Sequence, residues 1–324
     1  MRIAVLGLGF MGSTHVEALN RVSGAELVAV YSSDSRKLAG DLTSIQGNLG
    51  GPGGSFDFTK LKPYTRIEDL LADSEIEAVD LCLPTDLHEP VTIAALRAGK
   101  HVLVEKPMAL DGASARRMIA EAERAQRVLM AAQVLRFFPE YVALRNAMPG
   151  LGVVRSATFA RRCGEPGWGG WLKDPARSGG GVFDLLIHDV DMCLHLFGPP
   201  QAVAATGSGD WVAGQFFYPR FTVGIDGGWQ VPAYPFCMEY RVTMERGTLE
   251  FSSAGRPPVL YTDVETVLPL PEIDGYAAEI AYFVECCRAG KRPERCLPEE
   301  SAAAVEWMNA LLAARERGGE RIEC

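Results

Sequence analysis

The stretch RIAVLGLGFMGSTHVEALNRV at residues 2–22 decides the fold of the first part of this chain. It begins as a short apolar run typical of a buried strand and ends in apolar residues at helical spacing. Between them lies a GxGxxG turn, in which Gly7 permits a tight turn, Gly9 lets backbone approach a pyrophosphate and Gly12 lets the helix pack closely. The helix would also offer free N–H groups and a positive dipole to phosphates. We predict a dinucleotide-binding turn, the alternative being a glycine-rich turn with no ligand.

Apolar strands and helices continue to alternate as far as about residue 133. Further strands are predicted at 26–31, 77–84, 101–104 and 127–133, and helices at 35–45, 67–73, 88–99 and 113–126. The glycine-rich segment 46–64 lacks periodicity and is predicted to be a loop or short hairpin, either a surface excursion or a cofactor lid. The alternation predicts a parallel, doubly wound sheet, which is an α/β Rossmann domain at residues 1–131.

The alternation breaks after residue 133, which predicts a second domain at residues 132–324. This region holds a strand at 153–163, a long loop with two tryptophans and a helix at 182–198. Short β-like runs separated by Gly and Pro, from 202 to about 270, predict a mostly antiparallel sheet in an α+β domain. Two helices close the chain, and these C-terminal helices are candidates to pack back on the first domain.

Composition narrows the class of protein. The 324 residues carry a net charge of −9 and 48% are hydrophobic, as in globular proteins. No basic cluster is dense enough to follow phosphates, so no nucleic-acid partner is expected. No apolar run approaches the roughly 18 residues of a membrane helix, and the N-terminus does not resemble a signal peptide. The eight cysteines form no CxxC pair and lack zinc-ligand spacing, so we expect reduced thiols, no metal and a cytoplasmic protein.

The end of the strand at 26–31 bears on the cofactor. An acid usually stands there in NAD-binding chains and binds the ribose 2′-hydroxyl, but this sequence has Ser32 and Ser33. Small hydroxyl side chains leave room for a 2′-phosphate, which Arg36 can bind with charge-assisted hydrogen bonds. We favour NADP over NAD. Asp34 keeps NAD open, because its carboxylate could reach the ribose if the turn is tight.

The heptapeptide HVLVEKP at 101–107 joins an apolar strand to a lysine at the strand's carboxyl end. In an open parallel sheet, ligands bind beyond this end. Pro107 fixes its own φ and restricts the backbone of Lys106. Thr85 and His88 follow the preceding strand in the same way. We expect Lys106 to meet the ligand, the alternative being a surface lysine after a core strand.

The helix VFDLLIHDVDMCLHLF at 182–197 carries Asp184, His188 and Asp191 on one face among apolar residues. A polar stripe of this kind is costly to bury without a purpose, and a carboxylate beside His188 fixes its tautomer and raises its basicity. The glycines before the helix would let a ligand come close. We predict acid–base chemistry here, the alternative for His188 being a satisfied core histidine. We interpret His15 as structural.

Several motifs follow one another in a specific order. They are the glycine turn, TDLHEP at 85–90, AGKHVLVEKP at 98–107, RFFPEY at 136–141 and SGGGVFDLLIHDVD at 178–191. Together they resemble the Gfo/Idh/MocA family of dinucleotide-dependent oxidoreductases. The resemblance implies a Rossmann domain followed by an open-faced sheet domain, often a cis peptide before the EKP proline, and a homodimer or homotetramer formed through the open sheet face. Lys106 matches the family's EKP lysine, and Asp184 and His188 match its Asp-x-x-x-His pair.

The resemblance also implies a reaction, namely hydride transfer between nicotinamide and a CH–OH or C=O carbon of a sugar, polyol or related small molecule. His188, oriented by Asp184, is the first choice as base, with Lys106 polarising the same oxygen or acting as the base itself. The expected cofactor contacts are Gly7, Gly9, Phe10, Met11, Gly12, Ser32, Ser33, Arg36, Pro84, Thr85, His88, Glu105 and Lys106. The expected substrate contacts are Arg136, Arg162, Trp171, Asp184 and His188.

The sequence leaves two other functions possible. One is a glycosidase that uses bound NAD for transient oxidation, which would show no net change in NAD(P)H. The other is a non-catalytic NADP-binding sensor, which has no need for Lys106, Asp184 and His188 together. The sequence does not identify the substrate.

Overall fold

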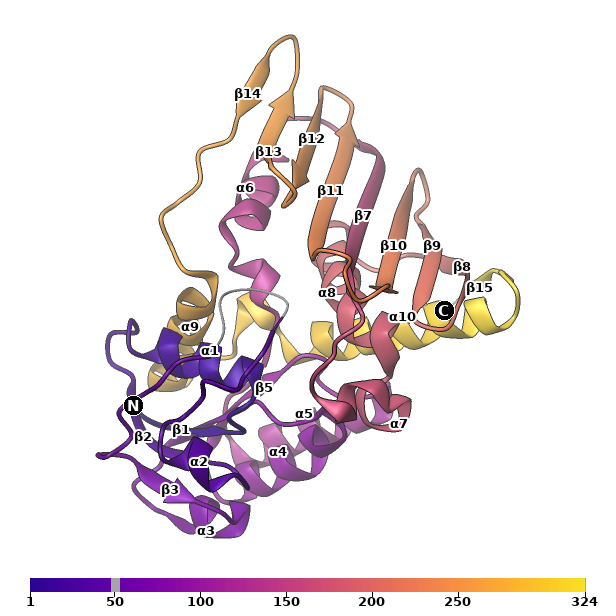
Figure 1. The fold of residues 1–324 in the computed structure, drawn as a ribbon. Coiled ribbons are helices and arrows are strands. Elements are labelled where there is room, and N and C mark those ends of the chain that lie inside the picture. The colour runs from indigo at the N-terminus through magenta and orange to yellow at the C-terminus, as the bar shows by residue number, and fades with distance from the viewer. Residues whose placement is uncertain (48–52, 324) are drawn as a thin grey trace. The chain divides into compact units, whose positions relative to one another are not determined.

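A computed structural model describes residues 1–47 and 53–323 (Figure 1). The chain divides into two compact units. The first comprises Met1–Val134 and Asp274–Ala302, and the second comprises Leu135–Ile273 and Ala303–Cys324. The sequence placed a boundary at 131/132 and suggested that C-terminal helices pack back. The structure assigns the segment that begins at Asp274 to the first unit.

The first unit is built on a parallel sheet with strand order β3-β2-β1-β4-β5-β6, as a Rossmann fold requires. Its strands are β1 Arg2–Leu6, β2 Glu26–Tyr31, β3 Lys62–Tyr64, β4 Ala78–Leu81, β5 His101–Glu105 and β6 Leu129–Ala132. The central strands are apolar and buried because helices cover both faces of such a sheet. The carboxyl ends of β1, β4 and β5 therefore meet at one edge.

Helices connect these strands. They are α1 Phe10–Leu19, α2 Ser35–Leu38, α3 Ile67–Ala72, α4 His88–Arg97 and α5 Gly112–Ala125, joined later in the chain by α9 Gly275–Ala289. Their ends follow local chemistry: Asp111 accepts a hydrogen bond from the Ser114 N–H at the start of α5, and Gly99 has a φ of +77° just after α4. Within this unit, α9 contacts α1 and β5.

Two predictions for residues 35–64 were wrong in part. The helix predicted at 35–45 is only α2, and Asp41 leaves it to form a bridge with Ser55. The segment 46–64 was predicted to be a loop or short hairpin, but its last residues form β3, which pairs in parallel with β2. A loop prediction also covered residues 48–52, which lie outside the described residues.

The second unit is built on a mostly antiparallel sheet with strand order β14-β13-β12-β11-β7-β10-β9-β8-β15. Its strands are β7 Val154–Gly164, β8 Ala202–Ser208, β9 Trp211–Phe217, β10 Thr222–Gln230, β11 Cys237–Met244, β12 Gly247–Ser252, β13 Arg256–Tyr261, β14 Glu265–Val267 and β15 Ile322–Glu323. The pairing of β7 with β10 is parallel, and the other pairings are antiparallel among the described strands.

One face of this sheet packs against α8 Gly180–Phe197, which contacts β7 and β10. The other helices are α6 Pro139–Ala147, α7 Pro175–Ser178 and α10 Pro298–Glu316. Apolar residues of α8, the sheet and α10 share one core. Gly181, in the first turn of α8, serves this packing, because a Cβ there would lie 2.3 Å from the Trp229 ring. The prediction that the glycines at the start of the helix let a ligand come close stays a prediction.

Among residues 1–47 and 53–323, no helix combines the length and apolar character needed to cross a membrane. The described cysteines carry free thiols, and most of them are buried.

Candidate active site

The glycine turn after β1 has the geometry that its spacing predicts. Gly7 has a φ of +98°, and a Cβ there would lie 2.5 Å from the carbonyl oxygen of Cys82. A Cβ on Gly12 would lie 1.8 Å from the carbonyl oxygen of Gly7, so only glycine lets α1 approach the turn. At Gly9, by contrast, a Cβ would meet no atom within 4 Å. The turn is therefore tight behind Gly7 and Gly12 and open at Gly9.

The start of α1 suits an anionic ligand. Gly9 is the residue before the helix, and no side chain forms a capping hydrogen bond there. The first turn contains no acidic residue, and Phe10 and Met11 are partly exposed. Free N–H groups and the helix dipole favour phosphate at such a position. The residues present fit the pyrophosphate of a dinucleotide.

The segment after β2 is arranged by its own hydrogen bonds. The Ser32 hydroxyl is buried and accepts a hydrogen bond from the Asp34 N–H at 3.1 Å. The Asp34 carboxylate accepts one from the Arg36 N–H at 2.9 Å, which lowers the pKa of Asp34. The Arg36 guanidinium is exposed and lies 3.5 Å from Asp34. Ser33 is also exposed. The end of β2 therefore offers a ligand the Ser33 hydroxyl and the Arg36 guanidinium, while Asp34 is hydrogen-bonded to the start of α2.

The turn after β4 assigns a different role to one predicted cofactor contact. Pro84 precedes a 3₁₀ turn that begins at Thr85. His88 is 1% exposed, and its ring nitrogens lie 2.8 Å from the Pro107 carbonyl oxygen and 2.9 Å from that of Leu83. Burial lowers the pKa of His88. Both nitrogens face backbone oxygens, so we correct the prediction that His88 contacts the cofactor.

Lys106 directly follows β5 at the carboxyl edge of the sheet. The side chain is half-buried, and the Lys106–Pro107 peptide is cis, as the family resemblance implied. The Lys106 N–H donates to Oε2 of Glu105 at 3.1 Å. Glu105 is 5% exposed, so its carboxylate lies inside the unit. Here Glu105 supports the backbone of Lys106.

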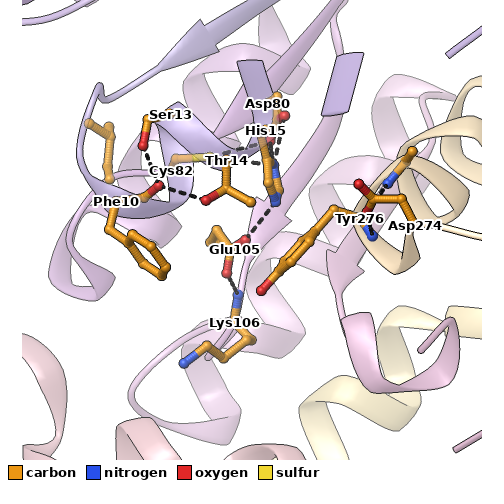
Figure 2. Close-up of polar contacts among 12 residues, drawn as sticks. Phe10, Ser13, Thr14, His15, Asp80, Cys82, Glu105, Lys106, Asp274 and Tyr276 are labelled. Carbon is orange, nitrogen blue, oxygen red and sulfur yellow. Dashed lines mark hydrogen bonds and ion pairs between the residues drawn. The ribbon is translucent and has the colours of Figure 1, made fainter. Parts of the chain in front are cut away.

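His15 was interpreted as structural, and the structure places two carboxylates beside it, which its neighbours in the sequence did not reveal (Figure 2). Its ring is fully buried, with Nδ1 at 2.9 Å and 3.0 Å from the two carboxylate oxygens of Asp80 and Nε2 at 3.1 Å from Glu105 Oε1. Tyr276 packs against the ring, with centroids 6.0 Å apart. Burial alone would lower the pKa of His15, but Asp80 raises it well above its usual value. His15 thus lies between two carboxylates, one hydrogen-bonded and one at ion-pair distance.

This histidine predicts a pH dependence of stability. A pKa raised in the folded state stabilises the fold fully below the unfolded-state pKa of about 6.5, and the contribution is lost as pH rises through the folded-state pKa. The free energy of unfolding of the wild type should exceed that of His15→Gln most at about pH 6, and the difference should narrow toward alkaline pH. Urea unfolding from about pH 6 to about pH 9 measures it. A difference that widens with pH would contradict the prediction.

In the second unit, most of α8 is buried, and one pair of polar residues on it is partly exposed. Within residues 180–193, all of which the structure describes, every residue is buried except Asp184 and His188. The two are four residues apart and share one face of the helix. A carboxylate and an imidazole thus stand together, half-buried, on an otherwise buried helix. This is suitable geometry for acid–base chemistry.

The other acids of α8 have structural partners. Asp191 is 1% exposed and accepts hydrogen bonds from Arg136 Nε at 2.9 Å and Nη2 at 2.7 Å. Asp189 is fully buried and binds Arg161 at 2.8 Å and 3.1 Å. Such bidentate pairs satisfy charges that are too costly to bury alone. Asp191 therefore does not belong with the half-exposed pair, and Arg136, itself 2% exposed, is corrected from a substrate contact to an ion-pair partner.

Arg162 lies on the other face of the sheet. Its neighbour Arg161 binds Asp189 of α8, and successive side chains of a strand point to opposite faces. Arg162 instead pairs with Asp226 and, at 3.2 Å, with Glu239. Arg162 thus lies on the sheet face away from α8, and its predicted contact with a substrate stays a prediction.

Trp171 keeps its place among the substrate candidates. It is partly exposed in a 3₁₀ turn, Gly170–Lys173, and this turn contacts α8.

Comparison with known proteins shows the family. One family model, described as an oxidoreductase family with an NAD-binding Rossmann fold, matches residues 1–133. A second, described as the GFO/IDH/MocA C-terminal domain, matches residues 149–250. The chain belongs to the Gfo/Idh/MocA family of oxidoreductases. The resemblance seen in the sequence is thereby confirmed, as is the Rossmann and open-sheet fold class.

Individual family members are distant. The myo-inositol 2-dehydrogenase of Thermotoga maritima is 32% identical over 217 residues, which make up 64% of this chain but only 58% of that relative. An inositol 2-dehydrogenase of Salmonella typhimurium is 26% identical, and the match covers 99% of this chain and 96% of the relative. The solved structure of an aldose-aldose oxidoreductase from Caulobacter crescentus, complexed with glycerol, has a TM-score of 0.85 at 23% identity and covers 100% of this chain and 99% of its own. The last likeness supports the fold.

In this Gfo/Idh/MocA chain, the predicted catalytic residues come from both units. Lys106 belongs to the first unit, together with the glycine turn that fits a dinucleotide. Asp184 and His188 belong to the second. Sequence reasoning missed the ionic contacts of His15, although one signal was present: Asp80 is an acid inside the apolar run of β4.

Proposed function

We propose that this chain is an NAD(P)-dependent oxidoreductase that transfers hydride between nicotinamide and a CH–OH or C=O carbon of a sugar or polyol. The observation that carries the proposal is the half-exposed Asp184–His188 pair on an otherwise buried stretch of α8. In the first unit, the glycine turn fits a dinucleotide, and Lys106 lies at the same edge of the parallel sheet as this turn. The relatives named inositol 2-dehydrogenase support a polyol or sugar as the substrate class.

In the proposed mechanism, each residue acts on the hydroxyl group that is oxidised. When bound, the nicotinamide ring takes up the hydride. His188 accepts the hydroxyl proton as general base, and Asp184 favours the protonated imidazole that results. Lys106 donates a hydrogen bond to the same oxygen and stabilises its developing negative charge. In the reducing direction, His188 returns the proton to the oxygen.

We further propose that NADP is preferred over NAD. The support is the exposed Ser33 and Arg36 at the end of β2, where Asp34 is engaged with the Arg36 N–H. Arg36→Ala should then weaken binding of NADPH by about tenfold to a hundredfold, the range for a lost hydrogen bond to a charged group, and leave NADH binding nearly unchanged. Fluorescence titration with each reduced cofactor measures both effects.

A matched control for Arg36→Ala is Arg66→Ala, an exposed arginine of the same unit, whose loss should affect neither cofactor. If Arg36→Ala weakens NADH and NADPH equally, the residue does not bind the 2′-phosphate. Tighter binding of NADH than of NADPH by the wild type would refute the proposed preference.

The function is tested by a screen of polyols, aldoses and keto-sugars with NAD and NADP in parallel, which follows the absorbance of the reduced nicotinamide. Net reduction or oxidation of the cofactor, dependent on one substrate class, is expected. Hydrolysis of a glycoside without net change in NAD(P)H would refute the dehydrogenase and indicate a glycosidase. Cofactor binding without turnover of any substrate would favour a sensor.

A further inference from the structure

Lys106 is preceded and followed by residues that two buried histidines contact. On one side, His15 lies 3.1 Å from Oε1 of Glu105, whose Oε2 accepts the Lys106 N–H at 3.1 Å. On the other side, His88 Nδ1 lies 2.8 Å from the carbonyl oxygen of Pro107. Both histidines are at most 1% exposed, so neither can contact a substrate directly. Their contacts converge on three consecutive residues, 105–107.

Each histidine also has a second contact that ties it to the sheet. His15 belongs to α1, three residues after the last glycine of the phosphate turn, and its Nδ1 binds Asp80 of β4. His88 opens α4, and its Nε2 lies 2.9 Å from the Leu83 carbonyl oxygen just after β4. Each ring therefore links the β4 side of the sheet edge to the end of β5. Figure 2 shows this link for His15, with Lys106 directly beyond Glu105.

The two ring nitrogens of His15 face two different carboxylates. Nδ1 is hydrogen-bonded to Asp80, and Nε2 lies 3.1 Å from Oε1 of Glu105, within ion-pair distance but without hydrogen-bond geometry. Asp80, Glu105, the Cys82 thiol and the Tyr276 ring surround it from β4, β5 and α9. The contact with Nε2 fixes the orientation of the Glu105 carboxylate. That orientation sets the acceptor for the Lys106 N–H.

We propose that His15 and His88 are positioning residues for Lys106, which fix the backbone on its two sides and so aim its side chain. This inference rests on the proposed function for its kinetic consequence, but the structural link can be tested without any substrate. His15 would act through Glu105, and His88 through the carbonyl group of Pro107. Because His15 lies on the helix that starts at the phosphate turn, the same contact ties the lysine to the cofactor helix.

A metal site is the competing interpretation of part of this cluster. His15, Cys82 and Glu105 lie close enough together to hold an ion. Both ring nitrogens of His15 are already opposite carboxylates, however, and burial raises the pKa of the Cys82 thiol, so the thiolate that a metal prefers is disfavoured. The ion-pair interpretation accounts for all the contacts.

The test compares His15→Leu, His15→Gln and His88→Leu with the wild type. The first readout needs no substrate: hydrogen exchange of the Lys106 amide, measured by NMR on the intact protein. Loss of the imidazolium should speed this exchange by about tenfold to a hundredfold, as expected when a hydrogen bond to a charged group loses its support. The second readout uses the substrate found in the screen. There kcat should fall by about tenfold to a hundredfold, with KM and NADPH binding within about threefold.

The matched control is His101→Leu, at the other end of the same strand. His101 is a partly buried histidine, and its Nδ1 accepts a hydrogen bond from the Val128 N–H at 2.9 Å. Its loss should leave exchange at Lys106 and kcat near wild-type values. His15→Gln retains an amide donor and should recover part of the loss seen in His15→Leu. This graded recovery distinguishes positioning from general destabilisation.

The outcomes are decisive in either direction. If a folded His15 variant shows unchanged exchange at Lys106, the proposal is wrong for His15, whether or not a substrate is known. If His15→Leu does not fold, His15→Gln and His88→Leu decide by the same readouts. A parallel fall in kcat and cofactor binding would also overturn the proposal, because it would show a general effect on the unit. Faster exchange without a substrate from the screen would leave the positioning role supported and the proposed function refuted.

Discussion

Replacing Lys106 with methionine is expected to lower kcat by about 10²–10⁴-fold, the range for losing a positioned acid or base. Methionine keeps much of the length of the side chain and removes the ammonium group. Lys106 lies at the carboxyl edge of the parallel sheet, where ligands bind, and His88 contacts the carbonyl oxygen of the following residue, Pro107. The variant lacks the ammonium charge, which in the wild type would stabilise the oxyanion that develops as the hydroxyl proton leaves.

The measurement is steady-state kinetics with the substrate from the screen, alongside fluorescence titration of NADPH. Cofactor binding should change by less than about threefold, since the phosphate turn is formed by Gly7, Gly9 and Gly12 rather than by the lysine. Lys60→Met, at an exposed lysine of the same unit, is the control and should behave as wild type. A Lys106→Met protein that turns over as fast as the control would exclude the mechanism.

The residual activity of Lys106→Met can also identify the base. A base must be deprotonated, so kcat/KM falls as pH drops through its pKa. If His188 is the base, this acidic limb should persist in Lys106→Met at a lower rate. If Lys106 is the base, the limb should disappear with it.

Sequence patterns predicted the elements whose signals are local. The strands at 2–6 and 26–31 have the predicted limits, because apolar β-branched runs bounded by glycine or serine specify buried strands. In the glycine turn, the steric roles of Gly7 and Gly12 were predicted correctly, because a Cβ would clash with backbone at both positions. The family confirmed by comparison was already visible in the order of the motifs.

Other features depend on pairing partners far along the chain. The strand β3 reads Lys-Pro-Tyr, with neither apolar periodicity nor a favoured strand residue at its centre, and it exists because β2 offers an edge. A tertiary contact decides this case, and propensity does not record it. The helix predicted at 35–45 instead ends at Leu38 for a local reason, because Gly40 adopts a φ of +89° just after it.

The candidate site shows the same division. The spacing of Asp184 and His188 was enough to predict that they share one face of α8. The sequence did not reveal that Asp191 is buried in an ion pair with Arg136. On β7, alternation predicts that adjacent arginines point to opposite faces, yet nothing local says which face meets α8. The position of Arg162 on the face away from α8 was not predictable for that reason.

Replacing Arg161 with methionine should lower the free energy of unfolding by about 3–5 kcal/mol. The Arg161 guanidinium binds both oxygens of Asp189, which is fully buried, and donates to the Tyr141 hydroxyl at 3.2 Å. Removal of the arginine alone leaves the carboxylate in the core without its counter-charge. Urea unfolding of the second unit measures the loss, with the tryptophan fluorescence of that unit as the signal.

The neighbouring residue provides the control for Arg161→Met. Arg162→Met removes the same group from the next position of β7, but that arginine is 26% exposed, so its pairs should contribute only about 0–1 kcal/mol. The double variant Arg161→Met/Asp189→Leu should regain most of the lost stability, because two apolar side chains replace two charges. A double variant as unstable as the single one would show that packing, and not the stranded carboxylate, causes the loss.

The same experiment separates anchoring from catalysis on α8. Asp189 holds the helix to the sheet, whereas Asp184 and His188 stand on its half-exposed side. If the ion pair serves only as an anchor, the double variant should keep the wild-type kcat under conditions in which it is folded. The single variant should lose activity in proportion to its unfolded fraction. If kcat falls in the folded double variant, the buried charges also affect the Asp184–His188 pair. Anchoring and catalysis on α8 would then be electrostatically coupled.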